Sequence, residues 1–147
     1  MRSKRMNNRQ RGFTLIELLV VLVILGLLAS LAGPKVISYL GGAKSDSAKL
    51  QLGEFDMSLD LYKLEVGRYP TTQEGLQGLV QQPSGTTGWN GPYLKKQTVP
   101  KDPWGNEYHY VSPGQHGAYD LFSLGGDNRE GGEGENKDVT NWEEGKK

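Results

Sequence analysis

The apolar residues near the start of the chain form one nearly continuous run. From Phe13 to Gly33 the only charged residue is Glu17. A helix of this length spans about 31 Å, close to the hydrocarbon thickness of a bilayer at about 30 Å. The run therefore predicts a transmembrane helix. A cleaved secretory signal peptide is the alternative, but its apolar region is shorter, about 7–15 residues.

Beyond Pro34 the pattern becomes amphipathic. Apolar residues recur at three- and four-residue steps, as on one face of a helix, at Ala48, Leu52, Phe55, Leu59 and Tyr62. We expect one long helix over about residues 14–65, with its second half packed on a globular domain. Pro34 lacks a backbone donor and is expected to kink or loosen it, and Gly41-Gly42 is a second soft point.

The rest of the chain indicates short elements. Thr71 and Glu74 have capping-box spacing and predict a short helix that Pro83 closes. Alternating residues predict strands over 106–111 and 119–124, and a third near 139–142. These elements together predict an α+β fold, with a small antiparallel sheet beside the long helix.

Charge is distributed unevenly along the chain. There are 17 basic and 17 acidic residues in total, but residues 1–12 hold five basic residues and no acidic one. The positive-inside rule then places the N-terminus in the cytoplasm and exports the rest. Residues 13–147 carry a formal charge of −5, which argues against nucleic-acid binding.

Composition limits how the exported part can be stabilised. The chain has no cysteine, so disulfides, thiol catalysis and Cys-based zinc sites are excluded. Only 35% of the residues are hydrophobic, and many of them lie in the early run. A core this small usually needs another staple, such as a metal ion or a partner.

Residues 125–138 form a glycine-rich acidic loop with three possible interpretations. A phosphate cradle is disfavoured because acidic groups repel phosphate and no helix follows. Solvated disorder is the simplest alternative. A calcium site is the third, since carboxylates and carbonyls are the ligands that calcium prefers. An EF-hand is excluded because Arg129 and Gly131 stand where ligating oxygens are needed. The acidic residues are Asp127, Glu130, Glu133, Glu135 and Asp138.

No active site is evident, and we expect a protein that is not an enzyme. His109 and His116 have no nearby catalytic serine, and Ser123 lies in no nucleophile-elbow motif.

Glu17 is unusual because a carboxylate inside an apolar run is costly and often functional. The local alternative is that Thr14 and Glu17 form a capping box at the start of the helix. Both roles are compatible.

The junction Gly12-Phe13-Thr14 and the run after it, GFTLIELLVVLVILGLLASL, resemble the N-terminal signature of type IV pilins and type II secretion pseudopilins. The resemblance implies cleavage between Gly12 and Phe13 by a prepilin peptidase that also methylates the new amine of Phe13. It also implies that Glu17 pairs with the Phe13 amine of a neighbouring subunit and sets the register of a filament.

A second resemblance covers about residues 12–142. The segments GRYPTTQEGLQGLV, GPYL, VPKDPWGNEYHYVSPGQHGAYDLFSLGGD and DVTNW are similar to the major pseudopilins of type II secretion. It implies a type IV pilin-like fold and one Ca²⁺ in the C-terminal loop, as a staple. By matching position, the ligands include the Leu124 carbonyl and the Asp127 side chain; Asp138 is the choice for the returning carboxylate, and Glu133, Glu135 or Asn136 are further candidates.

This resemblance implies a structural role. Residues 1–12 would be a cleaved leader, 13–33 a transmembrane and filament-core helix, and 34–147 a periplasmic domain. Copies would leave the inner membrane to form a helical homo-oligomeric pseudopilus that helps drive folded proteins across the outer membrane. The implied partners are minor pseudopilins, the prepilin peptidase, the inner-membrane secretion platform and, before assembly, lipid.

Two alternatives stay open. A type IV pilin for adhesion or motility is one, although the chain lacks the disulfide that many such pilins have. A membrane-anchored periplasmic enzyme or calcium-dependent binding module is the other.

Overall fold

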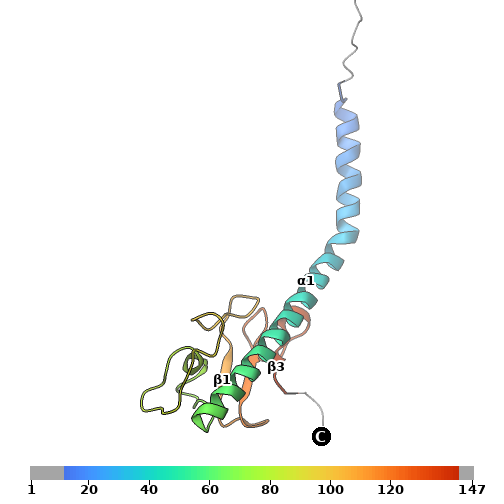
Figure 1. The fold of residues 1–147 in the computed structure, drawn as a ribbon. Helices are drawn as coiled ribbons and strands as arrows, with labels where there is room; N and C mark the ends of the chain where they lie inside the picture. The colour runs from blue at the N-terminus through green and yellow to red at the C-terminus, as the bar shows by residue number, and fades with distance from the viewer. Residues whose placement is uncertain (1–11, 143–147) are drawn as a thin grey trace, which may run out of the picture. The chain divides into compact units, whose positions relative to one another are not determined.

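The computed structural model describes residues 12–142, so the predicted basic leader lies outside the described residues apart from Gly12. Its elements, in chain order, are α1 (Leu15–Val66), η1 (Leu76–Leu79), β1 (His109–Val111), β2 (Asp120–Ser123), η2 (Gly134–Asn136) and β3 (Val139–Thr140). Figure 1 labels α1, β1 and β3. Contacts divide the chain into two units that meet between Ile37 and Ser38. Helix α1, Leu15–Val66, contributes residues to both units, which are described separately below.

The first unit is the apolar part of α1. Its large side chains are exposed all round the helix, from 48% for Val21 to 89% for Leu15. By length and composition this helix can cross a membrane, and none of its most apolar 18-residue window is buried. The helix continues through Pro34, so the missing amide donor does not end it.

The second unit is built on the amphipathic part of α1. The stripe predicted from the sequence is the buried face of the helix, consisting of Ala48, Leu52, Phe55, Leu59 and Tyr62. It packs in one core with Leu76 and Leu79 and with side chains of the sheet. The Phe55 and Tyr108 rings meet edge to face at 5.2 Å between centroids. The helix therefore supplies one wall of the core, and the sheet supplies another.

The sheet has three antiparallel strands in the order β1-β2-β3. They are β1, His109–Val111, β2, Asp120–Ser123, and β3, Val139–Thr140. Tyr110 lies opposite Leu121, and Ser123 lies opposite Val139. All three strands occur where predicted but are shorter. Strand β1 begins late because Asn106 is held in a turn, where its carbonyl accepts from the Asp102 amide at 2.8 Å.

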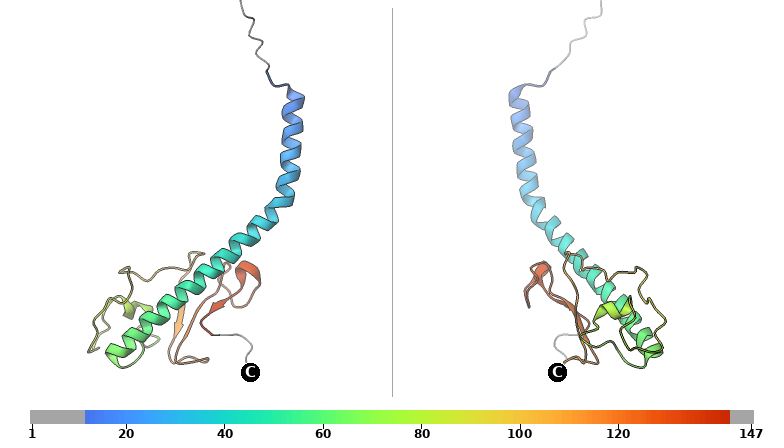
Figure 2. Two further views of the ribbon diagram at one scale, coloured as in Figure 1. Left: turned by 45° about the vertical axis from the view of Figure 1, so that its right-hand side comes forward. Right: turned by 90° about the vertical axis from the view of Figure 1, so that its left-hand side faces the viewer.

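The predicted short helix after Thr71 is the 3-10 helix η1, Leu76–Leu79, and no α-helix forms there. The Thr71–Glu74 capping box does form. Gly75 then adopts φ 58°, which is incompatible with continuing a right-handed helix. The loop around residues 125–138, in red in Figure 2, lies beside α1, and its Glu135 side chain is next to Gly41. A Cβ atom at Gly41 would overlap the Cγ atom of Glu135.

Candidate functional site

The first candidate site is the N-terminal junction. Gly12 and Phe13 precede α1, and the Phe13 side chain is 88% exposed. Thr14 and Glu17 form the predicted capping box: the Thr14 amide donates to Glu17 Oε2 at 3.0 Å, and the Glu17 amide donates to Thr14 Oγ1 at 3.3 Å. Within residues 12–142 the other carboxylate oxygen of Glu17 has no hydrogen-bond partner. The box thus leaves one acceptor available.

The second candidate site is the glycine-rich loop. The Asp127 carboxylate accepts from the Arg129 amide at 3.2 Å, across a turn in which Asn128 has φ 54°. Asp138 Oδ2 accepts from the Gly131 amide at 2.9 Å. Asp138 Oδ1 is buried without a partner. A buried oxygen of this kind is costly unless a donor or a cation satisfies it.

The further candidate calcium ligands, Glu133, Glu135 and Asn136, lie in or next to the 3-10 helix η2, Gly134–Asn136. Glu133 is exposed, whereas the Glu135 side chain lies against Gly41 of α1. The Glu135 carbonyl accepts from the Gly126 amide at 2.8 Å, which closes the loop on itself. Within the described residues, no three His, Cys, Asp or Glu side chains gather in a group able to hold a metal ion. Calcium binding here would therefore depend on backbone carbonyls as well.

The carboxyl group of Asp102, which the sequence alone did not indicate as important, is buried next to the start of this loop. Asp102 is 4% exposed and accepts hydrogen bonds from the Trp104 and Asn106 amides at 3.0 and 2.8 Å. The Ser123 hydroxyl also donates to it, at 2.5 Å. An Asp-Pro-Trp-Gly sequence is typical of a turn, but nothing in the local sequence indicates that Asp102 has a long-range partner at the end of β2.

The histidines occupy structural positions. The His109 ring stacks on Phe122 at 5.1 Å between centroids, and the His116 ring stacks on Trp142 at 4.1 Å. His116 Nδ1 also contacts Asp120 Oδ2 at 3.0 Å. Burial raises the pKa of Asp120, but amide donors from Gln115 and His116 outweigh it, and the net pKa is lowered. His116 therefore connects Trp142, at the end of the described chain, to Asp120 in β2.

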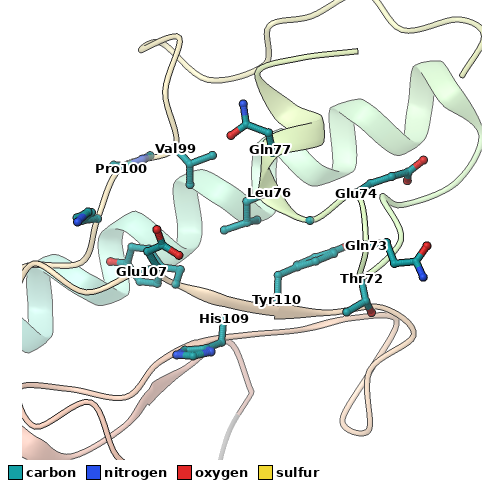
Figure 3. A pocket seen from close by; sticks show the side chains of 13 residues that line it. Thr72, Gln73, Glu74, Leu76, Gln77, Val99, Pro100, Glu107, His109 and Tyr110 are labelled. Atoms are coloured by element: carbon teal, nitrogen blue, oxygen red, sulfur yellow. The ribbon is translucent and has the colours of Figure 1, made fainter. Parts of the chain in front are cut away.

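His109 and Tyr110 also line a groove of about 450 Å³ between β1 and the turn around Gln73 (Figure 3). Two of its polar side chains, Glu74 and Tyr110, are engaged in structural bonds. The Tyr110 hydroxyl donates to the Pro70 carbonyl at 2.8 Å, and burial raises the Tyr110 pKa to about 12. Glu74, on the groove wall, is bound to Arg68. The Tyr110 bond holds the turn to the sheet, and the Arg68–Glu74 pair holds the turn to the residues just after α1.

A long exposed apolar helix, followed by an amphipathic half that packs on a small antiparallel sheet, is the architecture of the pilin-like class of proteins. Comparison with known proteins agrees. Residues 7–33 match the prokaryotic N-terminal methylation motif, and residues 35–142 match the family model of type II secretion system protein G.

Individual relatives give the same result. The chain is 48% identical to the type II secretion system core protein G of Pseudomonas aeruginosa, over 92% of this chain and 96% of that protein. Identity to its counterpart in Vibrio cholerae is 45%, over 91% and 92%. The major pseudopilin of enterohaemorrhagic Escherichia coli has a similar crystal structure, with a TM-score of 0.61 and 33% identity over 76% of this chain and 89% of that one.

The chain belongs to the type II secretion system protein G family, the major pseudopilins. The predicted family and the type IV pilin-like α+β fold are thereby confirmed.

Proposed function

We propose that this pseudopilin works by packing the apolar half of α1 against the same segment of neighbouring copies in the type II secretion pseudopilus. Membership of the family confirms the predicted role of a structural pseudopilus subunit. One observation carries the packing proposal: the apolar residues from Leu15 to Leu31 are exposed on every side of the helix. Such a surface must be covered by lipid or by protein.

The composition of this segment suits both environments. Ser30 donates its hydroxyl to the Leu27 carbonyl at 2.7 Å, so its polar atom is satisfied within the helix. Around Gly26 and Gly33 there is open space where a side chain would stand, which allows neighbouring helices to approach closely. The segment would therefore lie in the inner membrane first and in the filament core after assembly.

The order of events follows from the N-terminal junction. A prepilin peptidase cuts between Gly12 and Phe13 and methylates the Phe13 amine, after which Glu17 pairs with that amine on a neighbour. The exposed positions of Gly12 and Phe13 and the matched methylation motif support this step. The C-terminal domain lies in the periplasm, where it meets minor pseudopilins, while the inner-membrane platform receives the anchored subunit. The chain carries out no catalysis of its own.

Mass spectrometry of the mature N-terminus tests the processing step. We expect a chain that begins at Phe13 with an N-methyl group. An intact Met1, or a cut near Ala32, would contradict it.

A cross-linking experiment tests the packing. Because the chain has no cysteine, Val23→Cys introduces a single thiol on the exposed apolar segment. In assembled filaments, a bifunctional thiol reagent that spans more than the separation of about 8–10 Å between packed helices should join neighbouring copies through residue 23. The same variant, diluted in detergent, should stay monomeric and serves as the control. Equal cross-linking in both samples would argue against specific packing.

We also propose that the loop of residues 125–138 binds one Ca²⁺. The Leu124 carbonyl and the Asp127 and Asp138 carboxylates are the main ligands, and Glu133, Glu135 or Asn136 supply others. The buried, unpartnered Asp138 Oδ1 supports this proposal because it needs a cation or a donor. The ion would offset acidic charge and staple a chain that has no disulfide.

Thermal unfolding of the full chain, with calcium and with a chelator, tests the calcium site. We expect a higher midpoint with calcium, because a ligand that binds only the folded state stabilises it. Asp138→Asn should lose most of that difference, whereas Glu130→Gln, at an exposed loop position outside the proposed set, should keep it. An equal midpoint with calcium and chelator for the unmodified chain would contradict the proposal.

A further inference from the structure

We propose that Asp102 is a positioning residue for the calcium loop, and that it acts through Ser123 to aim the carbonyl of Leu124. This inference rests on the proposed calcium site. Asp102 lies 22 positions before Leu124 in the sequence and is not a proposed ligand. It reaches the loop only because the turn after Lys101 packs against the end of β2.

The first step is the environment of the carboxyl group. A buried carboxyl group is costly unless its oxygens are hydrogen-bonded. Asp102 has three donors: Oδ1 accepts from the Trp104 and Asn106 amides, and Oδ2 accepts from the Ser123 hydroxyl. The first two bonds fix the turn itself. The third reaches another element and is the one that connects the turn to the loop.

The second step is the Ser123 hydroxyl. Ser123 is fully buried at the end of β2, and its hydroxyl proton is directed to Asp102. Its oxygen then accepts from the Gly125 amide at 3.2 Å. One hydroxyl thus links the buried carboxyl group to the backbone where the loop begins.

The third step follows from peptide planarity. The Gly125 N–H and the Leu124 carbonyl belong to the same peptide group, and in a trans peptide they point in opposite directions. Fixing the Gly125 N–H on Ser123 therefore fixes the direction of the Leu124 carbonyl, a proposed calcium ligand. Asn106, bound to the same carboxyl group, donates its side-chain amide to the Gly125 carbonyl at 3.1 Å. Both backbone groups of Gly125 are consequently held by the side chains of Ser123 and Asn106, two residues that also donate hydrogen bonds to Asp102.

The competing explanation is that Asp102 only stabilises the turn. The two explanations differ in what they predict for calcium affinity. Replacing a residue that only stabilises the fold lowers the unfolding midpoint of the calcium-free protein and leaves the calcium dissociation constant unchanged. Replacing a positioning residue also weakens calcium binding, typically on the order of ten- to a hundredfold for groups that orient a metal ligand.

The test measures both quantities on the full chain in detergent. Calcium affinity is measured by isothermal titration after chelator removal, and the calcium-free midpoint by near-ultraviolet circular dichroism. Asp102→Asn keeps the side-chain size but replaces the acceptor that faces Ser123 with a donor. Ser123→Ala keeps the two amide bonds of the Asp102 turn and removes the hydroxyl that links Asp102 Oδ2 to the Gly125 amide. Glu74→Gln, which weakens a surface ion pair away from this network, is the control for destabilisation alone.

We expect both Asp102→Asn and Ser123→Ala to weaken calcium binding at least about tenfold. Glu74→Gln should lower the midpoint and bind calcium as the unmodified chain does. Unchanged affinity in Ser123→Ala overturns the inference, and it decides the question even when Asp102→Asn does not fold. Absence of calcium binding by the unmodified chain is a different result, because it overturns the proposed calcium site itself.

Discussion

The same Thr-x-x-Glu capping box occurs twice in this chain, once at the start of α1 and once just after its end. In the first, the Thr14 amide donates to Glu17 at 3.0 Å, and in the second the Thr71 amide donates to Glu74 at 2.8 Å. The reciprocal bonds to the threonine hydroxyls are 3.3 and 3.2 Å. Locally, the two boxes are nearly identical.

They differ in what lies beyond the box. Both oxygens of Glu74 also accept from the Arg68 guanidinium, at 2.6 and 2.7 Å, and this ion pair lowers the Glu74 pKa to about 2. Glu17 has no basic side chain paired with it within residues 12–142. One sequence motif therefore serves two purposes. Glu74 is satisfied by its own chain, whereas Glu17 retains capacity for a partner from outside, which we propose is the Phe13 amine of a neighbour.

The largest predicted effect is on assembly. Glu17→Gln keeps a side-chain oxygen for the capping bond but removes the negative charge, so filament formation should be lost while membrane insertion continues. Electron microscopy of sheared filaments and membrane fractionation measure the two outcomes. Glu74→Gln is the matched control, and it should assemble because its charge is used within one chain. Normal filaments from Glu17→Gln would end the register proposal.

The second predicted effect is on stability, and here the substitution of Glu74 should have the larger effect, whereas for assembly it is the substitution of Glu17. Glu74→Ala removes a cap and an ion pair, so the free energy of unfolding should fall by about 2 kcal/mol. Glu17→Ala should change it by less than about 0.5 kcal/mol, because exposed substitutions outside the packed unit cost little. Near-ultraviolet circular dichroism reports on the second unit, which contains Glu74, since every tyrosine and tryptophan lies beyond residue 38. Equal losses in both variants would contradict this distinction.

The comparison also indicates which features could be predicted from the sequence. Both capping boxes, the long helix and its buried stripe depend on neighbours three or four positions apart, and all of them were predicted. The Asp102–Ser123 bond was missed because its partners are 21 positions apart and meet only after the chain folds. The exact strand lengths were missed for a similar reason, since the Asp102 turn shortens β1. Hydrophobic periodicity predicts which face of an element is buried, whereas hydrogen bonds between residues far apart in the sequence can be identified only from the folded structure.

The smallest predicted effect is a pH dependence confined to the second box. The Arg68 ion pair lowers the pKa of Glu74 from 4.5 to about 2, so its stabilisation is complete above about pH 4.5. It is lost as the pH falls from there towards about 2, where the folded protein also binds the proton. Because the Arg68 side chain is 45% exposed, solvent screening limits the contribution to about 1 kcal/mol.

Urea unfolding of the unmodified chain and of Glu74→Gln, each with chelator to remove any effect of metal, measures this contribution. The difference in unfolding free energy should be about 1 kcal/mol at about pH 6 and should approach zero at about pH 2. The same comparison with Glu17→Gln should show no such convergence, because Glu17 has no ion pair of this kind within the described residues. A constant difference for Glu74→Gln across this range would mean that Arg68 contributes through its contacts rather than through its charge.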